Sequence, residues 1–373
     1  MLMDSFEVEN FRSLKHLKLE KLARVNLLVG KNNVGKSSVL EAIYTLANIE
    51  TNHWLFEIES DRGLDDEEID FRYLFHNFDS LSSINLKAGY KAIRPTRVAQ
   101  LRVEMKLEGS NLESIPESPT FTRKPSKKRR PTVTNGLAVR VWTSDKAKPL
   151  RFEIRHKEYS TSIIHSSAVA EKFTEQGWSS VAAPRNVSML LPTKVHYNQL
   201  SADLESLLVD KQLDRLIQTI HRVDPRIKSI ALLSESNIYL DLGKNFPSLS
   251  PLKLMGEGLQ KLLSITAAIA TTAGGIIFID EVDNGLHYSI LRIVWQGILQ
   301  AAREYDVQIV ATTHSAEAIR HLTWVLESEE YASYRDDVAA YTLIRAEDDT
   351  VRSYRHDYEQ LDYALDHGVE VRN

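Results

Sequence analysis

The sequence predicts an α/β fold, and two features of the chain indicate it. Compact apolar segments, among them VNLLV and residues 276–279, read as buried strands and alternate with segments of helical spacing. Strands that are apolar on both faces need helices on both sides, which is typical of a largely parallel sheet. Between residues 81 and 160 the pattern changes to alternation of apolar and polar residues, which predicts a β-rich segment.

The elements follow in a definite order. Residues 4–30 predict an antiparallel strand pair and then the strand VNLLV, and residues 36–47 predict a helix. Helix is expected again over 199–232, followed by short strands. The helix LQKLLSITAAIATTA, the strand GIIFIDE, the helix YSILRIVWQGILQAAREY and the strand VQIVATTHS come next. A β-hairpin around Glu347–Thr350 and a polar helix follow.

Four parts are expected from these changes of pattern. They are an N-terminal lobe (1–80), a β-rich insertion (81–198), a helical subdomain with a C-terminal lobe (199–330), and a hairpin with a helix that completes the fold (331–373).

Composition narrows the class of protein. The 373 residues are 43% hydrophobic, carry a formal net charge of −5 and include no cysteine. Disulfides, thiol catalysis and cysteine-based zinc sites are therefore excluded. The N-terminus lacks the apolar core of a signal peptide, and no apolar run approaches the ~18 residues of a membrane span. We expect a cytoplasmic protein without a membrane partner.

A glycine-rich loop lies between the strand VNLLV and the helix at 36–47. Residues 30–37, GKNNVGKS, fit the pattern G-x-x-x-x-G-K-[ST]. In this pattern backbone N–H groups form an anion nest, the lysine contacts the β- and γ-phosphates of a nucleotide, and the serine ligates Mg²⁺. The expected nucleotide-binding residues of the loop are Gly30, Asn32, Asn33, Gly35, Lys36, Ser37 and Ser38. The alternative is a glycine-bearing turn with a surface lysine.

Two later strands end in polar residues. The strand at 276–279 is followed by Asp280 and Glu281, which would hold Mg²⁺ and polarise an attacking water, respectively. The strand VQIVATT is followed by His314, which could hydrogen-bond a γ-phosphate or, alternatively, only cap the strand. Before a helix, residues 254–260 (LMGEGLQ) form a second candidate anion nest or an ordinary glycine loop. The joint order of these four segments favours an ATP site with Mg²⁺.

With these motifs the chain resembles an ABC-type ATPase of the SMC/RecF-like branch, and more narrowly the AAA15 or OLD-like (overcoming-lysogenization) group. The resemblance is carried by VENFRSLKHL with GKNNVGKSS (Walker A), LMGEGLQKLL (signature), IIFIDEVDNGLHYS (Walker B and D-loop) and ATTHS (H-loop). It implies a P-loop ABC-type ATPase head with a mixed sheet flanked by helices. A β-rich and helical insertion would lie between Walker A and the signature.

The resemblance also implies a homodimer that encloses two ATP molecules, or a higher even-numbered oligomer built from it. The signature residues Gly256, Glu257 and Gly258 of one subunit would face the γ-phosphate held by the other. Asp283 would belong to the D-loop at the interface, and Arg12 would lie near the nucleotide. Met255 departs from the usual signature serine, which predicts slow turnover. Gln100 is the candidate Q-loop residue.

Relatives of this kind often carry a Toprim nuclease, but the residues after the H-loop are too few for one. The resemblance therefore implies an ATPase that controls a separately encoded effector in an anti-phage defence system. The alternatives are a RecF/SMC-like DNA-repair ATPase and a nucleotide-dependent scaffold with slow turnover. A basic run could grip DNA or an acidic partner, or could be a solvated loop. Its residues are Lys124, Lys127, Lys128, Arg129 and Arg130.

Overall fold

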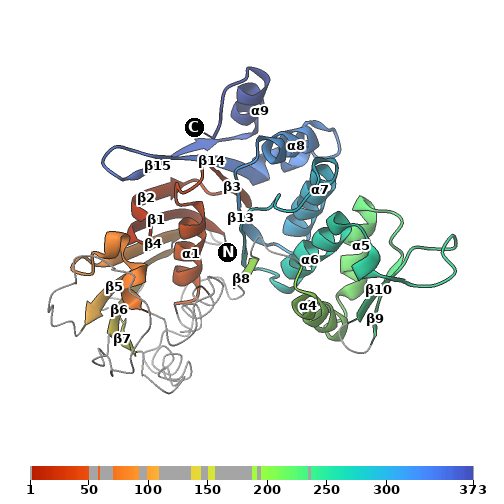
Figure 1. Cartoon of the computed structure of the whole chain (residues 1–373), viewed down its shortest axis with the longest axis horizontal. Helices are drawn as coiled ribbons and strands as arrows, with labels where there is room; N and C mark the ends of the chain where they lie inside the picture. The colour runs from red at the N-terminus through yellow and green to blue at the C-terminus, as the bar shows by residue number, and fades with distance from the viewer. Residues whose placement is uncertain are drawn as a thin grey trace, which may run out of the picture.

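A computed structural model describes residues 2–49, 58, 70–91, 99–108, 136–143, 150–155, 187–190, 195–233 and 237–372. Within these ranges the chain forms two six-stranded sheets, a three-stranded sheet and surrounding helices (Figure 1). The predicted α/β fold with a mixed sheet flanked by helices is confirmed.

The central sheet has the strand order β15-β14-β3-β13-β12-β8. Its strands are β3 (Val25–Val29), β8 (Val187–Leu190), β12 (Ile276–Ile279), β13 (Gln308–Thr313), β14 (Val338–Arg345) and β15 (Val351–His356). The pair β14-β15 is antiparallel, and the other neighbours are parallel. Every residue of β3 and β12 is buried, as expected for strands covered on both faces. The carboxyl ends of β3, β12 and β13 therefore meet at one edge.

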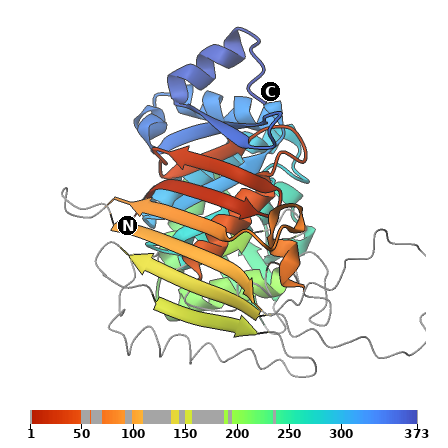
Figure 2. The same cartoon turned by 90° about the vertical axis from the view of Figure 1, so that its left-hand side faces the viewer.

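The second large sheet is antiparallel, with the order β2-β1-β4-β5-β6-β7 (Figure 2). Its strands are β1 (Met3–Phe11), β2 (Leu14–Glu20), β4 (Ile84–Tyr90), β5 (Ala99–Glu108), β6 (Gly136–Thr143) and β7 (Leu150–Arg155). The alternating segments after residue 81 thus extend the sheet that the N-terminal strand pair begins. The boundary at residue 80 between an N-terminal lobe and a β-rich insertion stays a prediction. Strands from both sides of that boundary belong to one sheet.

The remaining elements are mainly helical. The α-helices are α1 (Lys36–Ala47), α4 (Tyr197–Val209), α5 (Leu213–Val223), α6 (Glu257–Thr271), α7 (Tyr288–Glu304), α8 (Ala316–Glu327) and α9 (Tyr358–Asp366). The 3-10 helices are η2 (Phe71–Leu74), η3 (His76–Phe78), η4 (Leu252–Leu254) and η5 (Ala332–Asp337). The small sheet comprises β9 (Ser229–Leu233), β10 (Asn237–Asp241) and β11 (Ser250–Pro251).

Two hydrophobic cores lie on opposite faces of the central sheet. Leu28 faces the core that includes helix α1 and the antiparallel sheet, whereas Leu27 and Val29 face the core formed by helices α4 to α8. This division follows from the two-residue period of a strand. Strand β3 is therefore anchored on both faces immediately before the glycine-rich loop, which gives that loop a rigid base.

Several predicted elements are confirmed, and some were missed. Helix α1 has the predicted bounds, and the hairpin β14-β15 turns at residues 346–350. The predicted helical segment at 199–232 forms two helices, because residues 210–212 form a turn in which Lys211 has a φ of 57°. The prediction was wrong for its last residues, since α5 ends at Val223 and Ser229–Leu233 is strand β9. Helix α8 was not predicted.

Helices α6 and α7 approach closely at Gly258. A Cβ atom added there would lie 2.2 Å from Cδ1 of Ile290, whereas one added at Gly256 would meet nothing within 4 Å. We therefore expect Gly258→Ala to lower the free energy of unfolding by about 1–3 kcal/mol through overpacking. The control Gly256→Ala should change it much less. Urea unfolding measures both, and equal effects would contradict this account of the α6–α7 contact.

Candidate functional site

The glycine-rich loop connects the buried strand β3 to helix α1 through three residues of positive φ. Gly30 has a φ of 154°, Asn33 of 63° and Gly35 of 111°. A Cβ at Gly30 would lie 2.7 Å from the carbonyl oxygen of Leu343, and one at Gly35 would lie 2.8 Å from Cδ2 of Leu14. Glycine is thus required at both positions, and asparagine tolerates the left-handed region between them.

Lys36 folds back over this loop. Its Nζ donates hydrogen bonds to the carbonyl oxygens of Gly30 (2.7 Å) and Lys31 (3.0 Å). Burial lowers the pKa of Lys36, and the nearby charges of Asp280 and Glu281 oppose that change. The ammonium group therefore lies inside the loop, with carboxylates close by.

Asp280 joins the loop to the next two strands. Ser37 Oγ donates to Asp280 Oδ2 (2.8 Å), and Thr312 Oγ1 donates to Asp280 Oδ1 (2.5 Å). The three residues come from α1, the end of β12 and β13. A hydroxyl and a carboxylate oxygen are the ligand types that Mg²⁺ prefers, so Ser37 and Asp280 fit a Mg²⁺ ion.

Glu281 lies at a sharp bend after strand β12. Its φ is 46°, and its N–H donates to Thr312 Oγ1 (2.8 Å). The exposed His314 has its Nδ1 3.9 Å from Glu281 Oε1. Close by, Thr313 Oγ1 donates to Asp283 Oδ1 (2.5 Å). The structure thus brings Glu281, His314 and Asp283 together at the strand edge that carries Lys36.

Other predicted residues have different contacts or lie outside the described residues. The guanidinium Nε of Arg12 is 2.8 Å from Glu41 Oε2 in α1, and both side chains are largely buried. Gln100 pairs with Gly89 inside the antiparallel sheet. Among the residues described, no hydrogen bond or ion pair joins the segment 256–258 to the loop, although Gly256 and Glu257 are exposed at the start of α6. The basic run at 124–130 lies outside the described residues.

Sequence reasoning missed several residues at this edge. It selected the histidine of TTHS, whereas the two preceding threonines hold Asp280 and Asp283. It also missed Arg372, whose Nη1 donates to the carbonyl oxygen of His314 (3.1 Å). The two threonines could have been predicted, because hydroxyl side chains at the end of a buried strand indicate a polar site. No local pattern indicates Arg372.

Lys261 connects helix α6 to the segment after Glu281. Its Nζ donates to the carbonyl oxygen of Asn284 (2.5 Å), and burial lowers the pKa of Lys261 from its ordinary value of 10.5 to about 8, against the opposing effects of Asp283 and Glu281. Because the folded-state pKa is the lower one, the buried charge destabilises the fold below pH 8. That cost falls as the pH rises from 8 towards 10.5.

We expect the acetylation rate of Lys261 to show a midpoint near pH 8, since only the neutral amine reacts. Peptide mapping by mass spectrometry after brief acetic anhydride pulses between pH 6 and 11 measures it. A free lysine peptide added to the same tube provides the reference with a midpoint near 10.5. A midpoint for Lys261 equal to that of the peptide would contradict the effect of burial.

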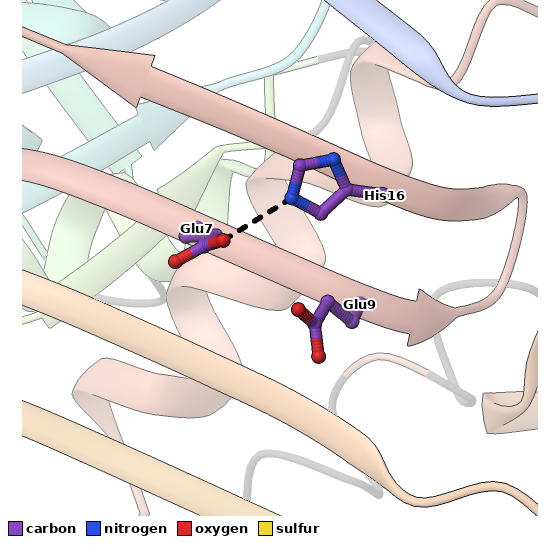
Figure 3. Close-up of side chains that lie close together, drawn as sticks. All are labelled: Glu7, Glu9 and His16. Carbon is purple, nitrogen blue, oxygen red and sulfur yellow. Dashed lines mark hydrogen bonds and ion pairs between the residues drawn. The ribbon is translucent and has the colours of Figure 1, made fainter.

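A separate cluster of charged groups lies on the solvent-facing side of the antiparallel sheet. Ligand-type atoms of Glu7, Glu9 and His16 lie within 4.8 Å of one another on β1 and β2 (Figure 3). Glu7 also contacts Lys87 on β4 (3.1 Å), and its pKa is lowered by its hydrogen bonds to His16 and Lys87 even though burial acts to raise it. These contacts form an ion-pair ladder across three strands, away from the phosphate loop.

A phosphate loop after a buried parallel strand, with a serine and an aspartate joined beside it, defines the class as a P-loop ATPase with an AAA domain. The comparison with family profiles is more specific. The chain belongs to the family described as "AAA domain, putative AbiEii toxin, Type IV TA system", whose profile matches residues 25–320.

Individual relatives agree with this class. The chain is 24% identical over 357 residues to an "ATP/GTP phosphatase" of Helicobacter pylori, covering 89% of this chain and 90% of the relative. It is 31% identical over 136 residues to the DNA replication and repair protein RecF of Clostridioides difficile, covering 35% of this chain and 36% of that protein.

Solved structures share the fold. The SMC head bound to the C-terminal winged-helix domain of ScpA superposes with a TM-score of 0.52 at 11% identity, covering 98% of this chain and 100% of the other. The SMC head domain of Thermotoga maritima gives 0.50 at 11% identity, covering 96% and 100%. At such identities the likeness concerns the fold alone. None of the helices described here has the length and apolar character needed to cross a bilayer.

Proposed function

We propose that this chain binds and hydrolyses ATP with Mg²⁺ and acts as a dimeric switch. One observation carries the proposal: Ser37 of the phosphate loop and Thr312 of β13 both donate to Asp280, directly beside Glu281. Segments more than 240 residues apart thus converge on the end of one loop. The relative called an ATP/GTP phosphatase supports the same reaction.

In this mechanism the residues of the loop hold the triphosphate. The backbone amides of the nest around Asn32 and Asn33, with Gly35 and Ser38, surround the phosphates, and Lys36 leaves its carbonyl partners to contact the β- and γ-phosphates. Ser37 and Asp280 would hold Mg²⁺, which neutralises charge on the phosphate oxygens. Because two carbonyl oxygens of the loop accept hydrogen bonds from the Lys36 ammonium group, a positive charge lies where the phosphates would bind.

Glu281 would orient the attacking water and accept its proton. His314 would contact the γ-phosphate from the other side of that water. Glu281 Oε1 lies 3.9 Å from His314 Nδ1, and Glu281 Oε2 accepts a hydrogen bond from Asn284 Nδ2 (3.2 Å), which the carboxylate would exchange for the water. The backbone amide of Glu281 donates a hydrogen bond to the Thr312 hydroxyl. This bond fixes the backbone from which the Glu281 carboxylate would act as a general base.

The dimer would place Gly256, Glu257 and Gly258 over the phosphates of the partner subunit, with Asp283 at the contact. Two exposed apolar side chains support an interface here: Leu254 is 76% exposed beside the signature, and Tyr288 is 58% exposed after the D-loop. Met255 offers no hydroxyl to the γ-phosphate, so we propose slow turnover. Arg12, being paired with Glu41, would act on the loop from behind α1.

The biological role that we propose is control of a separately encoded effector in an anti-phage system, as an AAA15 or OLD-like ATPase. The family description, which mentions a toxin–antitoxin system, supports a paired arrangement. A second candidate is a RecF-like DNA-repair ATPase, which the partial match to RecF favours. In that case Lys124, Lys127, Lys128, Arg129 and Arg130 would contact DNA.

Phosphate release by the wild-type chain tests the enzymatic part of the proposal. Hydrolysis should require Mg²⁺, stop on addition of EDTA and resume when Mg²⁺ is restored. Light scattering after gel filtration should show a dimer with ATP and Mg²⁺. No phosphate release above the buffer rate at any Mg²⁺ concentration would reject hydrolysis, and a monomer under all conditions would reject the dimeric switch.

A further inference from the structure

A groove of about 740 Å³ lies between β2 and β15, the edge strands of the two large sheets. The two strands run side by side (Figures 1 and 2). Asp357 and Gln360, at the N-terminal end of α9, line the groove. The volume is within the range of pockets that hold small molecules, about 300–1,000 Å³. None of the residues assigned to the ATP site lines it.

The groove carries an excess of cations. Within the described ranges Lys21, Arg352 and Arg355 line it and form no ion pair with a carboxylate. Its two acids already have partners: Glu20 pairs with Lys18 (2.5 Å), and Asp357 caps helix α9 by accepting from the N–H of Gln360 (2.9 Å). The uncompensated charge of the lining is therefore positive.

Hydrogen bonds from β14 and β15 occupy backbone acceptors at and just after the end of β2. Tyr341 donates its hydroxyl to the carbonyl oxygens of Glu20 and Lys21, each at 3.0 Å, and Arg355 Nε donates to Lys21 (3.1 Å). The Ser353 hydroxyl donates to the carbonyl oxygen of Lys18 (2.5 Å). These backbone acceptors are thus already satisfied, and the cations of the lining remain for an anion.

Negative charge next to the groove is partly neutralised as well. His16, which lines the groove, contacts Glu7 (Figure 3). Lys87 also contacts Glu7. Glu7 and Glu9 belong to β1 and do not line the groove.

The turn of the β14-β15 hairpin connects this groove to the phosphate loop. Arg345 donates to Asp349 Oδ1 (2.6 Å), to the carbonyl oxygen of Ser13 (2.8 Å) and to that of Val34 in the loop (3.3 Å). Asp349 also contacts Nε2 of the buried His76 (2.8 Å). Thr350, one residue further on, lines the groove. A ligand that moves this turn therefore moves a group that holds the phosphate loop.

We propose that the groove binds adjacent phosphate groups of a polyanion, and that Arg345 transmits this binding to the phosphate loop. The regulatory half of this proposal rests on the proposed ATPase function, whereas the binding half does not. The donors are supplied by Lys21, Arg352 and Arg355, on both sides of the groove.

Titration calorimetry with sodium tripolyphosphate tests the binding half. One variant, Lys36→Ala, removes the lysine of the phosphate loop. A second, Lys21→Gln/Arg352→Gln, removes two cations of the groove, and a third combines all three changes. We expect the Lys36→Ala protein to retain one site whose affinity falls at least tenfold when the groove changes are added. Lys106→Gln/Lys244→Gln, two exposed lysines elsewhere, is the matched control. No binding to the Lys36→Ala protein, or equal effects of groove and control changes, would overturn the proposal.

A labelled 12-nucleotide oligothymidylate distinguishes the source of the phosphates. If it binds the Lys36→Ala protein and tripolyphosphate competes with it, the phosphates belong to a nucleic-acid backbone. If tripolyphosphate binds in the groove and the oligonucleotide does not, they belong to a soluble compound. Both outcomes support a phosphate site, and binding of neither probe overturns it.

Steady-state hydrolysis at saturating ATP tests the transmission, because direct competition at Lys36 is then suppressed. Tripolyphosphate should change kcat at least twofold in the wild type and in the control variant. Tripolyphosphate should leave kcat unchanged in Lys21→Gln/Arg352→Gln and in Arg345→Gln. The Arg345→Gln protein should nevertheless bind tripolyphosphate. If tripolyphosphate changes the kcat of Arg345→Gln as much as that of the wild type, Arg345 does not transmit binding from the groove to the phosphate loop. If no variant hydrolyses ATP, the proposed function fails while the calorimetric result stands.

Discussion

Replacing Glu281 by glutamine is expected to lower kcat about 10²–10³-fold while ATP binding persists. Glutamine has nearly the same shape but cannot accept a proton from the attacking water, and a positioned general base contributes on this scale. The Thr312 hydroxyl binds the backbone amide of residue 281, so the bend should survive the change. Phosphate release measures kcat, and equilibrium binding of a fluorescent ATP analogue measures affinity.

Glu317→Gln provides the matched control, because Glu317 is an exposed acid in the first turn of α8, just after the TTHS segment. Its kcat should stay within a factor of two of the wild type. If Glu281→Gln hydrolyses ATP as fast as Glu317→Gln, then Glu281 is not the general base. If Glu281→Gln binds no nucleotide, the carboxylate has a binding role that this mechanism does not give it.

Lys36→Ala is expected to weaken ATP binding roughly tenfold to a hundredfold. A hydrogen bond between charged groups contributes about 1.5–3 kcal/mol, which corresponds to a change of that size. The lysine now lies over the loop, bonded to the carbonyl oxygens of Gly30 and Lys31, so its removal also leaves those two acceptors without their donor. Titration calorimetry with ATP and Mg²⁺ measures the affinity.

Lys31→Ala is the control for this change, because Lys31 is an exposed lysine of the same loop. Its loss should weaken binding by less than threefold, since its side chain takes no part in the proposed phosphate contacts. Equal losses of affinity in the two variants would indicate general electrostatic attraction rather than a specific contact by Lys36.

Elements with a strong local pattern could be predicted from the sequence. The strand VNLLV, the loop GKNNVGKS and helix α1 have periodicity and glycine positions that tertiary context does not alter, and their bounds agree with the structure. Helix α8 was missed because its polar residues, among them Arg320 and His321, obscure the apolar stripe of Ile319, Leu322, Val325 and Leu326 that packs against the helical core.

The arrangement of the strands and the contacts between distant segments could not be predicted. Strand β14 pairs parallel to β3 across more than 300 residues, and no local signal specifies this neighbour. The same holds for Arg345 and for Thr312, whose roles depend on which backbone carbonyl or carboxylate the fold brings close. The pairing of Arg12 with Glu41 likewise joins segments that no local pattern connects, and the position of Arg12 near a nucleotide stays a prediction.

The position of β3 between β13 and β14 has a consequence for synthesis on the ribosome. Both neighbours lie more than 280 residues further along the chain, so the strand that precedes the phosphate loop waits for that length to be synthesised before it can pair. Long-range parallel pairing is slow, and unpaired apolar strands are prone to aggregate. The nascent protein therefore has no complete nucleotide cradle until residues near 345 have left the exit tunnel, and chaperones that shield residues 25–29 should raise its yield.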